Sequence, residues 1–386
     1  AYDQLIAEGL LVTRSTSGIY VTALGLANQT SITEPGINNI EGSEESTSID
    51  SLDSFDAGPD SEQFPFQDWS RSLARVWKQP DRSLLHGRLV GGYAPLRQSV
   101  SRYLTAVRGI NCQPEQVIIT AGSRDALALI GDVFLQPGDK VALENPCYPP
   151  IRHQLNTLGA NIQHCAVDPE GMILPSSVSK LAFMTPARQY PLGIPQSIGR
   201  RLEWLDYSTK QQCWIVEDDY DSEFHYRKTP LATLYSMSSQ KQAEPDQRVL
   251  LVGSFSKLMF RTLRMGYLIV PQRLVPSFVS AQQRMGLMAS IMVQPALADF
   301  IGHRRFASHL RRMRGLYQQR RDFLYALIQR KLSHYLETDL PDCGMHLLVY
   351  LNPQFPHSDR WLEKALKTQG IHVAALSPHY QNDAVE

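Results

Sequence analysis

The amino-acid sequence predicts an α/β fold with a mostly parallel sheet and a small C-terminal α/β lobe. Between residues 117 and 270, short apolar runs alternate with segments of helical periodicity. Such alternation is typical of parallel strands joined by helices that cover both faces of a sheet. We expect a long helix over residues 277–332, interrupted near Pro295 and His303. A strand at residues 345–351 is expected in the smaller lobe.

Composition narrows the classes of function. The 386 residues contain 38 basic and 38 acidic side chains, so the formal net charge is zero. No overall field would attract nucleic acid, and any contact with DNA must be local. The five cysteines show no paired spacing, which fits a reducing compartment, and we expect a cytoplasmic protein. No apolar stretch is long enough to span a bilayer.

A lysine shortly after two serines is the most informative motif. Ser254, Ser256 and Lys257 lie between two apolar runs, so the lysine is expected on a loop between buried strands. Arg264 follows seven residues after the lysine. An amine can form an imine with an aldehyde, while hydroxyls and a guanidinium can hold a phosphate, and pyridoxal phosphate needs both. A surface Lys–Arg pair is the alternative for this motif alone.

A cluster of carboxylates ends an apolar strand about forty residues earlier, in residues 214–221. Carboxylates at this end of a strand lie where open α/β sheets bind ligands. An aspartate here can keep a pyridine nitrogen protonated, and Tyr220 can hydrogen-bond the phenolate oxygen of the ring. A solvated acidic loop and a metal site are the alternatives. We expect no metal, because no cluster of His or Cys lies nearby.

Two earlier turns offer further ligand groups. The sequence Gly122-Ser123-Arg124 lies between a predicted strand and a predicted helix. The start of a helix presents free backbone N–H groups to an anion, so these three residues are candidates for phosphate binding. The next strand ends in a turn with Tyr148, whose ring could stack on a flat ligand. A packed loop tyrosine is the alternative.

In this order, the features resemble the fold-type I pyridoxal-phosphate enzymes of the aminotransferase class I/II family, from about Phe55 to the end of the chain. Residues 91–97 resemble the Gly-Tyr-x-x-Leu-Arg entry to the large domain of that family. Residues 185–193 resemble the loop that carries Asn-Pro-Thr-Gly in ordinary aminotransferases, but contain Gln-Tyr-Pro-Leu-Gly. This variant and the sequence of residues 217–224 are similar to the MocR/GabR-type transcriptional regulators. In those proteins, an aminotransferase-like domain follows a GntR-type winged helix.

The N-terminal residues support this branch. Residues 2–9 indicate the end of a helix with a glycine cap, and two short β runs follow at 10–14 and 19–22. Residues 1–24 therefore resemble the second half of a GntR-type winged helix, the end of its recognition helix and its wing, with Arg14 as a candidate DNA contact. A small cap on an enzyme domain is the alternative. Because the chain begins inside a predicted helix, we expect further residues before it, and we expect truncation at the C-terminus too.

Residues 25–60 are expected to form a flexible acidic linker. No Lys or Arg occurs between Ser15 and Ser70, and much of this stretch is rich in Ser, Thr, Gly and Asn. Such a chain repels itself and extends, which suits a tether between a DNA-binding domain and a large body. The remaining boundaries are an aminotransferase-like domain at 61–386, its large part at about 90–290 and its small lobe at about 300–386.

The resemblance implies a role for each candidate residue. Lys257 would form the internal aldimine. Asp218 is preferred to Asp219 for the pyridine nitrogen, because in the family the aspartate precedes the ring-contacting tyrosine by at least two positions. Arg188 lies in the loop that faces the ring and could pair with the carboxylate of a substrate or effector. The other implied cofactor contacts are Tyr220, Gly122, Ser123, Arg124, Tyr148, Ser254, Ser256 and Arg264.

The chain departs from ordinary aminotransferases at several positions. The usual proline between Lys257 and Arg264 is replaced, His86 stands where the family often has a tyrosine, and no arginine follows Arg360. Ordinary aminotransferases carry a late arginine for the substrate carboxylate. Either this arginine lies beyond the expected truncation, or substrate binding differs. A basic stretch at residues 304–321 is either a solvated helix face or a docking surface for DNA, the acidic linker or a partner subunit.

We therefore expect a homodimeric transcriptional regulator that depends on pyridoxal 5'-phosphate and binds operator DNA through a winged helix. Its aminotransferase-like domain would sense pyridoxal phosphate or an amino compound bound as an external aldimine. Catalytic turnover is not expected, although residual half-transamination is compatible with these residues. The alternative is a genuine aminotransferase of the aminoadipate/kynurenine-like group, because a sensor and an enzyme need the same cofactor contacts.

Overall fold

The computed structural model describes residues 11–14, 18–21, 58–86, 89, 91–226, 231–241 and 246–381. The chain divides into two compact units, Ala1–Ser54 and Phe55–Glu386. In the first unit, β1 (Leu11–Arg14) and β2 (Gly18–Val21) pair antiparallel, with Leu11 opposite Val21. The two predicted β runs thus form a hairpin. The predicted helix at residues 2–9 and nearly all of the predicted linker lie outside the described residues.

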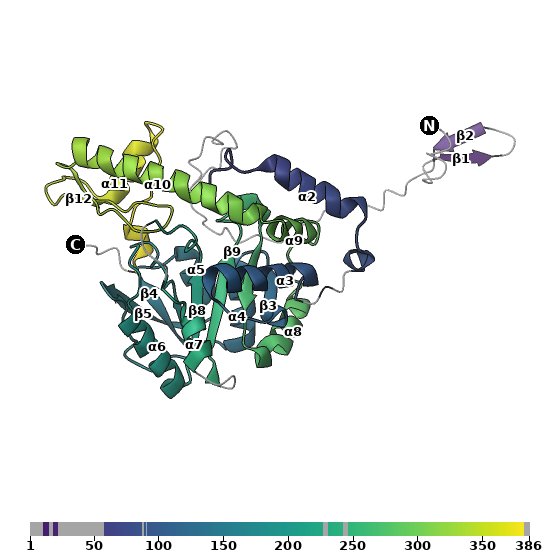
Figure 1. The fold of residues 1–386 in the computed structure, drawn as a ribbon, viewed down its shortest axis with the longest axis horizontal. Helices are drawn as coiled ribbons and strands as arrows, with labels where there is room; N and C mark the ends of the chain where they lie inside the picture. Colours follow the sequence, from purple (N-terminus) through teal and green to yellow (C-terminus); the bar gives the residue numbers. More distant parts are fainter. Residues whose placement is uncertain are drawn as a thin grey trace. The chain divides into compact units, whose positions relative to one another are not determined.

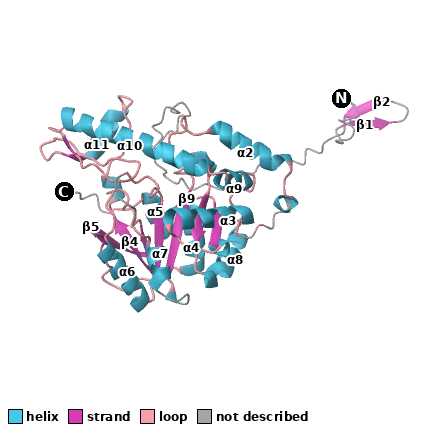
Figure 2. Cartoon of the chain, in the orientation of Figure 1, coloured by secondary structure: helices cyan, strands magenta, loops and turns pink. Residues whose placement is uncertain are grey.

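An eight-stranded sheet forms the centre of the second unit (Figures 1 and 2). Its strand order is β3-β10-β9-β8-β7-β4-β5-β6. Neighbouring strands from β9 through β8, β7 and β4 to β5 are parallel, whereas β10 is antiparallel to both of its neighbours. The expected mostly parallel sheet is confirmed. The strands are β3 (Val117–Thr120), β4 (Lys140–Asn145), β5 (Asn161–Asp168), β6 (Gly171–Met172), β7 (Leu181–Met184), β8 (Trp214–Asp219), β9 (Val249–Ser254) and β10 (Gly266–Ile269).

Two hydrophobic clusters lie on opposite faces of this sheet, because side chains alternate along each strand. Ile215 belongs to one cluster and its neighbour Val216 to the other. Helices α2, α3, α6 and α9 contribute to the first cluster, and α4, α5 and α8 to the second. The helices are α2 (Phe66–Lys78), α3 (Ala94–Tyr103), α4 (Ser123–Phe134), α5 (Pro149–Thr157), α6 (Ile198–Gln211), α7 (Leu234–Lys241), α8 (Val275–Met285) and α9 (Gln294–Gly302).

The long helix expected at residues 277–332 is three helices. The interruption expected near His303 is confirmed, whereas the one expected near Pro295 occurs earlier. Helix α8 already ends at Gly286, whose left-handed φ of 66° caps it. Pro295 lies in the first turn of α9, where its missing N–H costs no hydrogen bond, so it does not interrupt a helix. After His303, α10 (Arg305–Lys331) runs for 27 residues. Figure 1 shows α10 in light green. The shorter α11 (Asp359–Lys367) follows later in the chain.

The strand expected at residues 345–351 is also wrong in its extent. Only Tyr350–Leu351 (β12) pair, antiparallel to Leu336–Glu337 (β11). In residues 345–349, side chains from elsewhere in the chain bind the backbone carbonyls that would otherwise accept hydrogen bonds from a neighbouring strand. Arg188 donates to the carbonyl of His346, and Thr338 donates to the carbonyl of Leu348. Contacts from elsewhere in the fold therefore override the local β propensity.

The carboxyl ends of β3, β4, β7, β8 and β9 meet at one edge of the sheet. Thr120 pairs with Gly266, which also pairs with Ser254, and Gly253 pairs with Asp219. The turns that follow these strands therefore lie next to one another. Within the described part of the chain, no helix has the length and apolar character to cross a membrane.

Candidate functional site

Five carboxylates crowd the end of β8 and the turn after it. Each of four lies within 4.0 Å of an arginine: Glu217 of Arg201, Asp219 and Glu223 of Arg108, and Asp221 of Arg188. Asp218 has no such ion pair in the described structure. Its side chain is buried, and its Oδ1 has no hydrogen-bond partner there. A buried carboxylate oxygen without a partner is costly, so it points to a missing ligand group.

The charge of Asp218 depends on its surroundings. Burial is the main cause that raises its pKa to about 7, and the carboxylates of Asp219, Glu144 and Asp221 add to the effect. The amine of Lys257 acts in the opposite direction, which places that amine within electrostatic reach. A cation beside Oδ1 would favour the ionised form of Asp218. The protonated nitrogen of a pyridine ring is such a cation.

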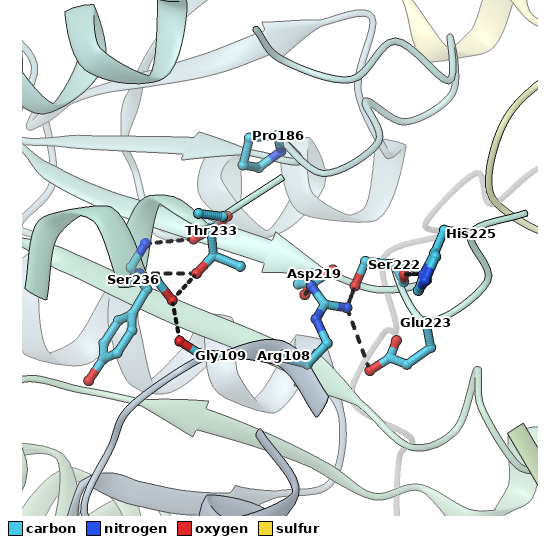
Figure 3. A network of polar contacts seen from close by, with 12 residues as sticks. Arg108, Gly109, Pro186, Asp219, Ser222, Glu223, His225, Thr233 and Ser236 are labelled. Carbon is cyan, nitrogen blue, oxygen red and sulfur yellow. Dashed lines mark hydrogen bonds and ion pairs between the residues drawn. The ribbon is translucent and has the colours of Figure 1, made fainter. Parts of the chain in front are cut away.

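Asp219, the alternative to Asp218, is already engaged in an ion pair through its Oδ2 (Figure 3). Its Oδ1 has no hydrogen-bond partner in the described structure, as for Asp218. Nη2 of Arg108 donates to its Oδ2 at 2.7 Å, and Nη1 of Arg108 donates to Oγ of Ser222. Arg108 ends η2 (Leu104–Arg108), a π-helical turn directly after α3. Arg108 and Asp219 are both buried, so this pair fixes the turn that carries Asp218 and Tyr220. Sequence reasoning missed Arg108, because the two segments lie more than a hundred residues apart.

Lys257 is half-buried in the turn after β9. The turn is closed by backbone and side-chain hydrogen bonds: Phe255 N donates to Met265 O at 2.9 Å, and Met265 N to Ser256 Oγ at 3.3 Å. Ser254 and Ser256 are half-buried at its start. Arg264 is exposed at its end, in a left-handed conformation with φ of 46°. The predicted lysine, hydroxyls and guanidinium thus lie on one closed loop.

The turn after β3 has the geometry of an anion site. Gly122 has φ of 114°, which favours glycine, and precedes the first residue of α4. Ser123 is half-buried and Arg124 exposed. The first N–H groups of a twelve-residue helix such as α4 have no partner within the helix, and they can bind phosphate oxygens.

An aromatic cluster centred on Tyr190 lies beside these groups. The ring centroid of Tyr190 is 5.6 Å from that of Tyr148 and 5.8 Å from that of Tyr220, both edge-on. His346 and His379 contact it at 5.6 and 5.3 Å. Burial lowers the pKa of His346 to about 3 and of His379 to about 4, so both imidazoles are neutral at pH 7. Tyr148 is 38% exposed, which leaves its ring accessible.

Tyr190 was not singled out from the sequence. It occupies the asparagine position of the Asn-Pro-Thr-Gly-like loop, and this position in the motif is the sequence feature that could have identified it as a site residue. Gln189 holds this loop: its Nε2 donates to Pro146 O and Tyr190 O, both at 2.7 Å, and its Oε1 accepts from Leu192 N. The side chain of Gln189 thus adds to the backbone hydrogen bonds of this loop, which run from Gln189 N to Ile194 O and from Gly193 N to Gln189 O.

Arg188 is almost fully buried and has internal partners. Its Nη1 donates to Asp221 Oδ2 at 3.3 Å, and its Nη2 donates to His346 O at 2.9 Å. A ligand carboxylate would compete with Asp221 for this guanidinium, so the effector role of Arg188 stays a prediction. Arg14 ends β1, and its contact with DNA also stays a prediction. The described residues contain no group of three or more His, Cys, Asp or Glu side chains that could hold a metal ion.

Comparison with known proteins decides the family. The model of the family "Aminotransferase class I and II" matches residues 60–175 and 201–383. The chain belongs to this aminotransferase family. Within it, the chain is 33% identical over 393 residues to the probable rhizopine catabolism regulatory protein MocR of Rhizobium meliloti, covering 98% of this chain and 78% of that protein. It thus lies in the branch of the MocR-type regulators, and both predicted resemblances are confirmed.

Other relatives of this aminotransferase-family chain include both regulators and enzymes. The pyridoxine biosynthesis regulator PdxR of Corynebacterium glutamicum is 28% identical over 98% of this chain and 79% of its own. The 2-aminoadipate transaminase of Thermus thermophilus is 26% identical over 82% of this chain and 77% of its own. The structure of the kynurenine aminotransferase of Pyrococcus horikoshii gives a TM-score of 0.75 at 23% identity, covering 85% of this chain and 82% of that one. This last likeness concerns the fold.

The residues of this site fit pyridoxal 5'-phosphate, the cofactor expected from the sequence. The unpartnered Oδ1 of Asp218 can accept a hydrogen bond from a protonated pyridine nitrogen. The amine of Lys257 lies within electrostatic reach of that carboxylate. A cofactor ring that contacts Asp218 would therefore have its aldehyde on the same side of the site as this amine. The start of α4 supplies free N–H groups for a phosphate.

Proposed function

We propose that this chain is the cofactor- and effector-binding part of a transcriptional regulator that depends on pyridoxal 5'-phosphate. The observation that carries the proposal is Asp218, the one carboxylate of the crowded segment 217–223 without an arginine ion pair in the described structure. In a relative that binds no cofactor, a buried carboxylate without a partner would cost free energy and nothing would offset that cost. The regulators among its relatives favour sensing over turnover.

Each candidate residue has a distinct task in this proposal. Bound pyridoxal phosphate supplies an aldehyde that reacts reversibly with amines, and a ring that accepts electrons. Lys257 holds the cofactor through its amine, and Asp218 keeps a proton at the pyridine nitrogen. Tyr220 donates a hydrogen bond to the phenolate oxygen, and the exposed ring of Tyr148 stacks on the cofactor. The proposed phosphate contacts are Gly122, Ser123, Arg124, Ser254, Ser256 and Arg264.

The effector is an amine that can displace Lys257, or pyridoxal phosphate itself. The names of two relatives mention rhizopine catabolism and pyridoxine biosynthesis. An effector that binds one conformation better than another would shift the regulator between states. Operator DNA would be bound through the winged helix to which residues 1–24 belong, with Arg14 as a contact. A homodimer and a cytoplasmic location complete the proposal.

A genuine aminotransferase is the second candidate. It is favoured by the complete set of Lys257, Asp218 and Tyr220, and by the relative named 2-aminoadipate transaminase. Arg188, the arginine proposed for a substrate carboxylate, already binds Asp221. Another described arginine, Arg152, donates to the carbonyls of Pro378 and Tyr380 beside His379 of the Tyr190 cluster. Both arginines are thus occupied internally, which favours the regulator.

One experiment separates the two functions. The cofactor-loaded protein is mixed with a panel of amino acids and excess 2-oxoglutarate while its absorbance is recorded. We expect a spectral change that is stoichiometric with protein and then stops. Amino donor consumed over many cycles would instead establish an aminotransferase. Full-length protein with operator DNA, with and without the reacting amino acid, then tests regulation directly.

A further inference from the structure

Helix α10 contacts the segment where the predicted linker ends and the large body begins. Backbone N of Asp60 donates to the hydroxyl of Tyr317 at 2.8 Å. Nη2 of Arg320 lies 2.7 Å from Oδ2 of Asp60, whose side chain is only 12% exposed. Arg312 donates to the carbonyl of Gln63 at 2.5 Å. Part of the basic stretch seen in the sequence thus holds residues 60–63.

The same helix contacts the turn that follows Asp218 and Tyr220. Arg314 donates through Nε and Nη2 to the carbonyl of Glu223, at 3.0 and 2.8 Å. The ring of Tyr317 packs edge-on against Phe224, with centroids 5.0 Å apart. The guanidinium of Arg321 lies 4.3 Å from the ring centroid of Tyr226. The segment 222–226 is therefore held by one face of α10.

Tyr317 is the one described side chain that takes part in both sets of contacts. Its ring contacts Phe224, and its hydroxyl binds the backbone of Asp60. Arg314 and Arg321 are three residues before and four residues after it, so the three side chains share one helix face. A displacement of segment 222–226 would move the ring of Tyr317 and thereby its hydroxyl.

We propose that α10 couples the cofactor site to the C-terminal end of the predicted linker, with Tyr317 as the joint between segment 222–226 and Asp60. The coupling rests on the proposed function, because a ligand at Asp218 is what would bias the position of segment 222–226. Such a ligand changes the hold on Asp60 only if it binds one arrangement of this segment better than another. The signal would then leave the large body at Asp60, the last residue of the predicted linker.

Amide hydrogen exchange of the whole chain tests the coupling, with the cofactor followed by its absorbance. Pyridoxal phosphate is the probe. We expect it to change the exchange rate in residues 58–66 by roughly threefold or more. Tyr317→Phe keeps the ring against Phe224 and removes the acceptor of the Asp60 N–H. This variant should bind the cofactor within about twofold of the parent and lose the response in residues 58–66.

Tyr325→Phe is the matched control, because the change is the same and lies on the same helix. It should retain the response. The proposal is overturned if the cofactor binds and residues 58–66 do not respond, or if Tyr317→Phe keeps the full response.

A ligand-free variant separates the coupling from the proposed function. Arg314→Gln removes the donors to Glu223 and touches nothing described in residues 58–66. Faster amide exchange in residues 58–66 of this variant supports the coupling through Tyr317, whether or not the protein binds the cofactor. A lack of cofactor absorbance would refute only the proposed function. Unchanged exchange there would count against the joint.

Discussion

Nη2 of Arg108 lies 2.7 Å from Oδ2 of Asp219, and both side chains are almost completely buried. This pair links the end of η2, the turn after α3, to the end of β8 across 111 residues of sequence. Asp218 immediately precedes Asp219 in the chain, so the pair controls where the unpartnered carboxylate points. Arg108 is therefore a positioning residue for the cofactor site, although it need not touch the cofactor.

Arg108→Lys should weaken cofactor binding while leaving the lysine attachment intact. An ammonium keeps the charge but cannot reproduce the fixed fork that reaches both Asp219 and Ser222. We expect the Kd for pyridoxal phosphate to rise by about tenfold, or about 1.4 kcal/mol. Fluorescence titration measures it, with Arg102→Lys on the exposed face of α3 as the control. A Kd equal to that of the parent would remove the positioning role.

Asp218→Asn should stabilise the cofactor-free protein as the pH rises. The pKa of Asp218 is about 7 in the folded protein against 3.8 ordinarily, so the folded state binds more protons between these values. The stability supplied by the protonated form is complete below about pH 4 and is lost as the pH rises through 7. Asparagine does not titrate, so its advantage grows across this window, to at most about 4 kcal/mol.

Thermal unfolding at pH 5 and pH 8 measures that advantage, and the matched control is Glu217→Gln. The pKa of Glu217 is also raised to about 7 by burial, but its carboxylate accepts hydrogen bonds from Leu234 N and Tyr235 N and lies near Arg201. By the same linkage, we expect Glu217→Gln to gain stability relative to the parent between pH 5 and pH 8. Unlike Asp218→Asn, it should be less stable than the parent at both pH values, because glutamine has one acceptor oxygen for two backbone donors. An Asp218→Asn variant that is no more stable at pH 8 than at pH 5, relative to the parent, would contradict the assignment.

Arg188→Gln should destabilise the protein by about 3 kcal/mol, because it leaves the carboxylate of Asp221 buried without its arginine. The double variant Arg188→Gln/Asp221→Asn should recover most of this loss in urea unfolding. The double variant also tests the effector role. If Arg188 binds an effector carboxylate, the preference for an amino acid over its decarboxylated amine should fall. An unchanged preference restricts Arg188 to the structural role.

Lys257→Ala should abolish the absorbance of the lysine-bound cofactor, because no other described lysine follows a strand at this edge of the sheet. Cofactor affinity should fall at least tenfold, since a covalent contact is lost. Lys180→Ala is a suitable control, because Lys180 is partly exposed and forms a surface ion pair with Asp139. An unchanged spectrum of the Lys257 variant would exclude the proposed cofactor attachment.

The sequence was sufficient to predict the sheet and the turns that carry the candidate residues. Runs such as Val249–Val252 are apolar because both faces of the sheet are covered, and this burial is directly visible in composition. The motif at Ser254–Lys257 follows such a strand, so its location at the sheet edge follows from local order alone. The same holds for Gly122 and Asp218.

The remaining features depend on contacts between distant segments. The pairing of Arg108 with Asp219 cannot be derived from either segment alone, and neither can the aromatic cluster around Tyr190. The strand expected at residues 345–351 failed for the same reason, because Arg188 and Thr338 bind its carbonyls. Local patterns predicted which groups are present, whereas long-range side-chain contacts decide which of them are already engaged.

Strand β10 runs against both neighbours, so the chain that leaves β9 must return to the same sheet edge within residues 255–265. Lys257 and Arg264 stand near the two ends of this return, which is closed by the bond between Phe255 N and Met265 O. The loop therefore acts as a spacer of fixed span. Residues inserted at the tip of this loop would leave the sheet intact. They would, however, change the distance between the amine of Lys257 and the guanidinium of Arg264, so that the two groups could no longer contact the aldehyde and the phosphate of one cofactor together.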